Sequence, residues 1–199
     1  IPYRVYGGLS FYQRKEIKDL VAYLRILVNE NDNEALMRII NYPARSIGET
    51  TQNKLIVFAD SQNVRVVDVL NNLGQYAPQL GLNNGVIAKL ADFWSMIKAF
   101  QVMLKTENAY TVAMEVAQRS GLIKFLKDDQ TPEGISRVEN VQELMNSMQG
   151  FIDEQKQLED GDPSLSSFLE NIALSTDQDK KSENEDQVSL MTIHLSKGL

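Results

Sequence analysis

The sequence contains no cysteine and only one histidine, His194. Disulfide bonds and thiolate metal sites are therefore excluded, and a zinc site built from histidines is not expected. No apolar run approaches the ~20 residues needed to cross a bilayer. The first residues lack the basic flank and the apolar core of a signal peptide. We therefore expect a cytoplasmic protein that holds no metal ion and has no membrane partner.

The sequence also lacks a Gly-x-x-x-x-Gly-Lys-Ser/Thr phosphate loop. A P-loop ATPase needs the backbone amides and the lysine of that loop around the β- and γ-phosphates of ATP. His194 has no cysteine to activate, and no nucleophile paired with a base is apparent. We predict no catalytic residue and no cofactor within these residues.

Positive charge is scarce, and its distribution is uneven. The formal net charge is −7, which argues against a general coat for nucleic acids. Residues 1–54 nevertheless carry a net charge of +2, whereas the remaining residues carry −9. A surface that faces phosphates is therefore expected to be local and to come from the N-terminal quarter, although so small an excess can also arise by chance.

Most of the chain shows apolar residues at helical spacing. Ile17, Leu20 and Leu24 define the apolar face of a helix over residues 11–28. Further helices are predicted over 33–41, from 49 onward, and over 64–73, 84–105, 109–120, 122–128, 132–157 and 164–174. Typical capping residues support several boundaries, among them Asn84, Asn108 and Thr131 at helix starts and Gly121 at a helix end. The predicted fold class is mainly α, with about eight helices.

Two short β-prone segments lie near the ends of this helical block. Residues 3–6 precede the breaker pair Gly7-Gly8, and residues 188–193 are largely apolar and β-prone. Residues 175–187 contain no apolar side chain, which predicts a flexible acidic linker. A helical block between two strands is the pattern of an insertion in an α/β domain, and we expect both strands to belong to one host sheet.

Four segments resemble one known family. Residues 191–199 are Met-Thr-Ile-His-Leu-Ser-Lys-Gly-Leu, which resembles motif V of the UvrD/PcrA/Rep-type superfamily 1 DNA helicases. Residues 7–19 are similar to the family's Gly-Gly-x-x-Phe-x-x-Arg-x-Glu-Ile-Lys-Asp segment. Residues 43–48, Pro-Ala-Arg-Ser-Ile-Gly, resemble its Pro-x-Arg-Gly-Ile-Gly loop. Residues 136–144 resemble its Thr-Arg-x-Glu-Asn-x-x-Glu-Leu stretch. The segments occur in the family's order and cover both ends and the middle of the chain.

The resemblance implies a domain division and a function. Residues 1–7 and 187–199 would be remnants of the RecA-like 2A subdomain, and residues 8–186 would be the all-helical 2B insertion. The parent would be an ATP-dependent 3′–5′ DNA helicase that uses ATP and Mg²⁺ and works in repair or replication. Its phosphate loop would lie outside this chain, so the chain alone is expected to lack ATPase activity. The implied partners are duplex DNA, the single-stranded junction, the remainder of the helicase and possible repair proteins.

The same resemblance implies two sets of DNA-binding residues. The family's Arg-Gly-Ile-Gly loop contacts duplex DNA, which implicates Arg45, Ser46, Ile47, Gly48, Thr50 and Thr51. A turn at a helix start exposes amides that can bind phosphate oxygens. Ser46 stands where the pattern has glycine, and the Glu49 carboxylate would repel phosphate. Motif V implicates Thr192, His194, Ser196 and Lys197 in contacts with the single strand.

Other interpretations remain open for part of this set. The basic residues Arg14, Lys15 and Lys18 could face DNA or form a solvated helix surface. Loop 43–48 could be a corner between two helices that serves compactness alone. The helical block as a whole could be a scaffold that docks repair or replication proteins, and the parent could be a subunit of a nuclease-linked helicase.

Overall fold

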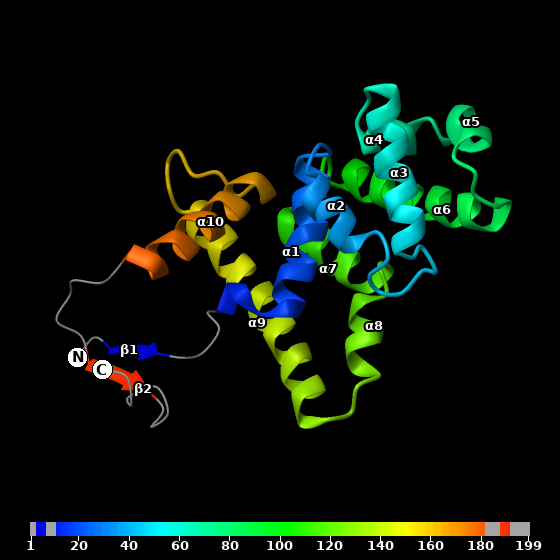
Figure 1. Ribbon diagram of the computed structural model, residues 1–199. Coiled ribbons are helices and arrows are strands. Elements are labelled where there is room, and N and C mark those ends of the chain that lie inside the picture. Colours follow the sequence, from blue (N-terminus) through cyan, green and yellow to red (C-terminus); the bar gives the residue numbers. More distant parts are fainter. Residues whose placement is uncertain (1–2, 7–10, 182–187, 192–199) are drawn as a thin grey trace.

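Residues 3–6, 11–181 and 188–191 are described by the computed structural model, and side-chain surroundings are described for residues 11–174. Ten α-helices occur in these described ranges (Figure 1). They are α1 Lys15–Val28, α2 Asn33–Ile39, α3 Glu49–Gln62, α4 Val66–Asn71, α5 Leu73–Tyr76, α6 Asn84–Met103, α7 Ala109–Arg119, α8 Leu122–Lys127, α9 Pro132–Gln155 and α10 Leu165–Lys181. Two 3₁₀ helices, η1 Phe11–Gln13 and η2 Ala77–Gln79, complete the helical part. The predicted mainly α class is confirmed.

Two strands pair near the chain ends. Strand β1 Tyr3–Tyr6 lies parallel to β2 Val188–Met191, with Tyr3 opposite Val188 and Tyr6 opposite Met191. The two arrows lie side by side in Figure 1. The breaker pair Gly7-Gly8 and the remaining motif V residues lie outside the described residues.

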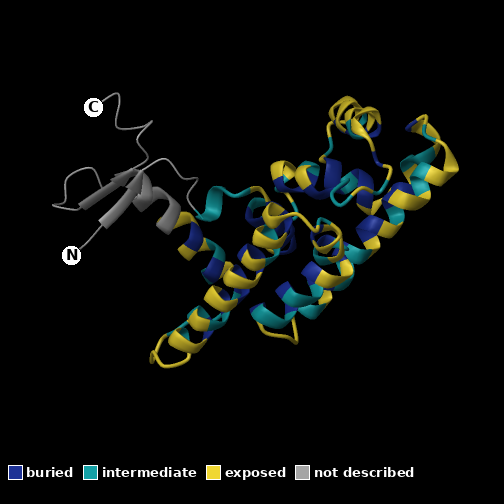
Figure 2. Ribbon diagram, turned by 90° about the horizontal axis from the view of Figure 1, so that it is seen from below, coloured by how far each residue is buried: buried dark blue, intermediate teal, exposed yellow. Residues whose placement is uncertain are grey.

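Helix α1 occupies the centre of the helical body and packs against α2, α6, α7, α9 and α10. Its buried stripe contains Ile17, Leu20 and Leu24, each fully buried, as their spacing predicts. Phe93 and Trp94 of α6 join the same core. Figure 2 shows helices that are buried on one side and exposed on the other, which is the arrangement expected when amphipathic helices surround one core.

Two helix boundaries differ from the sequence prediction. The helix predicted over 64–73 is divided into α4 and α5 at Asn72, whose backbone leaves the helical region and whose side-chain amide donates to the Asp68 carbonyl at 2.9 Å. The linker predicted from Ser175 onward is wrong for its first part, because α10 continues through Lys181. Glutamine and lysine have high helix propensity, and no glycine or proline ends this helix. Residues 182–187 lie outside the described residues.

Most predicted capping residues act as expected. Asn108 accepts a hydrogen bond from the Thr111 amide at 2.9 Å, and Thr131 accepts one from the Gly134 amide at 3.1 Å. Gly121 follows α7 with φ of 84°, a left-handed conformation that suits glycine. Asn83, rather than the predicted Asn84, caps α6 by accepting from the Val86 amide.

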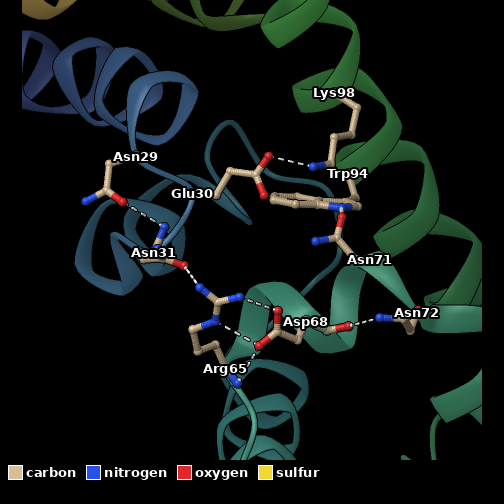
Figure 3. A network of polar contacts seen from close by, with 9 residues as sticks. All are labelled: Asn29, Glu30, Asn31, Arg65, Asp68, Asn71, Asn72, Trp94 and Lys98. Atoms are coloured by element: carbon tan, nitrogen blue, oxygen red, sulfur yellow. Dashed lines mark hydrogen bonds and ion pairs between the residues drawn. The ribbon is translucent and has the colours of Figure 1, made fainter.

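A polar network fastens α4 to its neighbours (Figure 3). The Trp94 indole N–H donates to the Asn71 side-chain oxygen at 2.8 Å, and Lys98 forms an ion pair with Glu30 at 2.6 Å. Arg65 precedes α4, binds Asp68 at 2.7 Å and also donates to the Asn31 side chain. Helix α3 packs mainly on α4. The network therefore helps to fix α3, whose first turn begins at the candidate site.

Replacing Glu30 with glutamine is expected to lower the melting temperature at pH 7 by a few degrees. Burial opposes ionisation of Glu30, but hydrogen bonds from Lys98 and Gln101 outweigh it and lower the pKa of Glu30 below its usual 4.5. A lowered pKa stabilises the fold above pH 4.5, and this stabilisation is lost as the pH falls through the folded-state pKa. The pair is partly exposed and should contribute at most about 1 kcal/mol.

Thermal unfolding at several pH values checks this prediction. The melting-temperature gap between the native chain and the Glu30→Gln variant should close as the pH falls below 4.5. Glu154→Gln, at an exposed position of α9, is the matched control and should show no gap. A Glu30→Gln gap that stayed constant down to pH 3 would contradict the role assigned to the ion pair.

Candidate nucleic-acid interface

The candidate interface is the connection between α2 and α3. Residues 40–48 leave the end of α2, turn at Pro43 and enter α3 at Glu49. The Asn41 side-chain oxygen accepts hydrogen bonds from the Arg45 amide at 2.8 Å and from the Ile47 amide at 3.0 Å. The Asn41 side chain therefore stabilises the turn, because it accepts hydrogen bonds from two backbone amides that would otherwise be unpaired.

The Arg45 guanidinium points into the protein, where it binds four oxygen atoms. It donates to the carbonyls of Ile39 and Pro43 at 3.1 Å each, and to the carbonyl of Ser120 at 2.8 Å. It also donates to the Tyr23 hydroxyl at 2.6 Å. Its central carbon lies 5.4 Å from the centre of the Phe93 ring. The side chain is only partly exposed, and its geometry does not favour a contact with external phosphate.

Tyr23 is fully buried in α1 and completes this arrangement. Its hydroxyl donates to the Tyr42 carbonyl at 2.6 Å and accepts from Arg45. Burial raises the pKa of Tyr23 to about 12, although the neighbouring Arg45 charge opposes that rise. Tyr23 is therefore neutral at any pH near neutrality, and its hydroxyl remains available both to donate and to accept.

Ser46 adopts a left-handed conformation with φ of 58°. Glycine adopts this conformation without steric cost, whereas a residue with a Cβ atom is strained there. The resembling family pattern has glycine at this position, so the backbone conformation explains why that residue type suits the loop. Ser46 is exposed, and nothing lies within 4 Å of a Cβ atom built on Gly48. The outer surface of the turn is therefore open.

The first turn of α3 offers unused backbone donors at this surface. Gly48 is the N-cap residue and has no side-chain capping bond, and the Thr51 amide is the first to bond within the helix. Gly48, Glu49 and Thr50 are all exposed. The positive end of the helix dipole and its first amides form an arrangement that can bind an anion. The exposed Glu49 carboxylate weakens this preference.

Two residues of the predicted loop set are buried. Ile47 is 0% exposed; its amide donates to Asn41 and its carbonyl accepts from Gln52 at 3.0 Å. Thr51 is 9% exposed. Their side chains pack inside the protein, which gives both residues a structural role, and their contact with DNA stays a prediction.

The basic residues predicted on α1 do not form one surface. Arg14 donates to the Asn140 side chain, and its guanidinium lies 5.5 Å from the Phe11 ring centre. Lys15 is exposed, binds Asp19 at 3.3 Å and lies 3.9 Å from the centre of the Tyr42 ring. Lys18 borders a hollow of about 680 Å³ between α1, α2 and α10. Of the three, Lys15 is the residue that touches the α2–α3 loop.

Two buried carboxylates were not anticipated from the sequence. Glu16 is 5% exposed and accepts from the Asn140 side chain at 2.6 Å. Asp19 is 2% exposed and binds Arg38 of α2 at 2.7 Å. The signal was present, because both acids stand beside the apolar stripe of α1. Residues 7–19 and 136–144, two of the segments that carry the family resemblance, thus meet through Arg14, Glu16 and Asn140.

The predicted motif V residues Thr192, His194, Ser196 and Lys197 lie outside the described residues. Within the described ranges, no group of three or more histidine or carboxylate side chains could hold a metal ion. No helix among them is both long enough and apolar enough to span a membrane.

The described residues form a mainly helical module in which the α2–α3 loop leads into an exposed helix start. Comparison with known proteins identifies the family. The model of the UvrD-like helicase C-terminal domain matches residues 1–199, and the chain belongs to this family. It is 36% identical over 199 residues to the ATP-dependent DNA helicase PcrA of Staphylococcus aureus. It is 37% identical over 202 residues to the protein of the same name from Staphylococcus epidermidis. Each alignment covers 100% of this chain and 26% of the relative.

Replacing Ser46 with glycine is expected to stabilise the chain by about 1 kcal/mol, because glycine removes the strain of the left-handed conformation. Urea unfolding measures the change. Ser61→Gly is the matched control, since Ser61 is an exposed residue inside α3. The control should destabilise by about 0.5–1 kcal/mol through the low helix propensity of glycine. Equal destabilisation by both substitutions would contradict the conformation assigned to Ser46.

Proposed function

We propose that this chain is the accessory region with which an ATP-dependent 3′–5′ DNA helicase holds duplex DNA ahead of the unwinding junction. Membership of the UvrD-like helicase C-terminal family supports the proposal, as do relatives named ATP-dependent DNA helicases. ATP and Mg²⁺ would bind elsewhere in the parent protein, since this sequence contains no phosphate loop. The parent would act in DNA repair or replication.

The proposed division of the chain follows from the same family. Residues 1–7 and 187–199 would belong to the RecA-like 2A subdomain, and residues 8–186 would form the 2B insertion. The parallel pairing of β1 with β2 supports this division, because an insertion must leave and re-enter one sheet of its host. Thr192, His194, Ser196 and Lys197 would then contact the single strand beside the motor.

One observation carries the duplex-binding proposal: the first turn of α3 is exposed and its amides are unused. Duplex DNA presents a regular row of phosphates, and backbone amides at helix starts are common partners for them. Such contacts do not depend on base sequence, which suits a motor that must act on any duplex. Gly48 allows close approach, because it has no side chain and nothing crowds its surface.

The charge of the chain limits the strength of this contact. The net charge of −7 repels DNA at long range, and the N-terminal quarter supplies only a local positive excess. Few phosphates are therefore neutralised, and affinity should fall as salt rises. We expect weak duplex binding by the 199-residue chain, strongest at low ionic strength. In the parent enzyme, contacts made by other parts would add to it.

Two substitutions of Glu49 distinguish the effect of its carboxylate on duplex binding from the effect of its backbone amide. Glu49→Ala removes a charge that repels phosphate and is expected to tighten duplex binding about threefold to fivefold. Glu49→Pro removes the same charge together with the backbone N–H, at the first helical position, where proline is well tolerated. It is expected to bind about tenfold more weakly than Glu49→Ala, because a hydrogen bond to a charged phosphate is lost.

Fluorescence anisotropy with a labelled duplex at low salt measures the dissociation constants of both variants. Circular dichroism verifies that the proline variant retains its helices. Equal affinity of the alanine and proline variants would refute phosphate binding by this amide. Absence of duplex binding by the native chain at low salt, together with specific capture of a repair protein, would favour a docking scaffold instead.

A further inference from the structure

We propose that Arg45 is a positioning residue: it holds the α2–α3 loop in the shape that exposes the first amides of α3, and it does not itself bind DNA. Asn41 performs the same task from the inner side of the loop. This inference rests on the proposed function, because it concerns the same surface. It reverses the role that the loop sequence alone suggests for the arginine.

The location of the guanidinium carries the argument. Ile39 is the last residue of α2, and Ser120 is the C-cap residue of α7. Arg45 donates to the carbonyls of both residues, at 3.1 Å and 2.8 Å. Carbonyls at helix ends lack partners within the helix, and the negative ends of helix dipoles attract a cation. One guanidinium thus joins the C-terminal ends of two helices.

The remaining contacts leave Arg45 little capacity for an external phosphate. Its two terminal nitrogens donate to four protein oxygens, including the Pro43 carbonyl and the Tyr23 hydroxyl. If the guanidinium turned toward DNA, the carbonyls of Pro43 and Ser120 and the Tyr23 hydroxyl would lose this donor, whereas the Ile39 carbonyl would keep the Tyr42 amide at 3.0 Å. A planar, forked donor group meets this requirement, whereas a lysine ammonium is a compact charge that cannot span these separated acceptors.

The contacts of Asn41 and the conformation of Ser46 connect the Arg45 interactions to the exposed surface proposed to bind DNA. We call Arg45 and Asn41, with the oxygen atoms and amides that they bind, the clamp. Asn41 binds the Arg45 and Ile47 amides, and these residues flank Ser46. The left-handed Ser46 therefore turns the chain between two fixed points, and Gly48 follows at the exposed start of α3. A change in the clamp should move the open amides without removing any charge that faces DNA.

The experiment compares Arg45→Lys with Arg45→Met in duplex binding over a range of salt concentrations. A positioning role predicts that both variants bind about tenfold more weakly than the native chain, because lysine cannot restore the geometry. The slope of log affinity against log salt should stay unchanged. A direct phosphate contact predicts that lysine largely restores binding and that methionine reduces the slope by about one. The second pattern would overturn the proposal.

Asn41 supplies an independent pair of variants in case the Arg45 variants do not fold. Asn41→Ala should weaken duplex binding, and Asn41→Asp should retain it in large part, because the carboxylate can still accept both amides. Arg137→Lys is the control, since Arg137 forms an exposed ion pair with Glu133. Native affinity in Asn41→Ala would overturn the proposal.

A measurement without DNA separates this inference from the proposed function. Hydrogen exchange of the Ile47 amide, which is bonded to Asn41, should be about tenfold faster in Arg45→Lys. Unchanged exchange would overturn the positioning role whether or not DNA binds. Faster exchange in a chain whose native form binds no duplex would support the clamp and refute the proposed function alone.

Discussion

The Arg45 guanidinium lies where three parts of the chain must meet: the end of α2, the end of α7 and the buried hydroxyl of Tyr23 on α1. Partly buried charge is costly unless it is well paired, and here the guanidinium donates to four protein oxygen atoms. The guanidinium therefore donates hydrogen bonds to carbonyls at two helix ends and, through the same contacts, holds the α2–α3 loop in place. We propose that the exposure of the first turn of α3 depends on this interaction.

A second set of polar contacts supports this arrangement from a greater distance. Asp19 and Glu16 are buried carboxylates that join α1 to α2 and to α9. The network around Trp94 and Lys98 fixes α4, on which α3 packs. Removing one partner of a buried charge leaves the other unpaired, so these contacts specify one arrangement of helices. The candidate interface is a product of the whole helical body.

Helix positions could be predicted from the sequence because apolar periodicity and capping residues are local signals, as at Ile17, Leu20 and Asn108. The loop could also be chosen as a candidate site from the sequence, through its resemblance to a family pattern, and its role stays a prediction. The partners of Arg45 could not be predicted, because Tyr23 and Ser120 lie 22 and 75 positions away in the sequence. The extension of α10 was missed because a polar composition fits both a solvated helix and a linker.

The central claim is that the backbone at the start of α3 contacts duplex DNA while Arg45 remains inside the protein. Amide chemical shifts, recorded by nuclear magnetic resonance during titration with a short duplex, test it most directly. The account predicts that the largest changes occur at Gly48, Glu49 and Thr50, with the Arg45 side-chain resonances nearly unchanged. Changes centred on the Arg45 guanidinium, or on a face remote from α3, would contradict it.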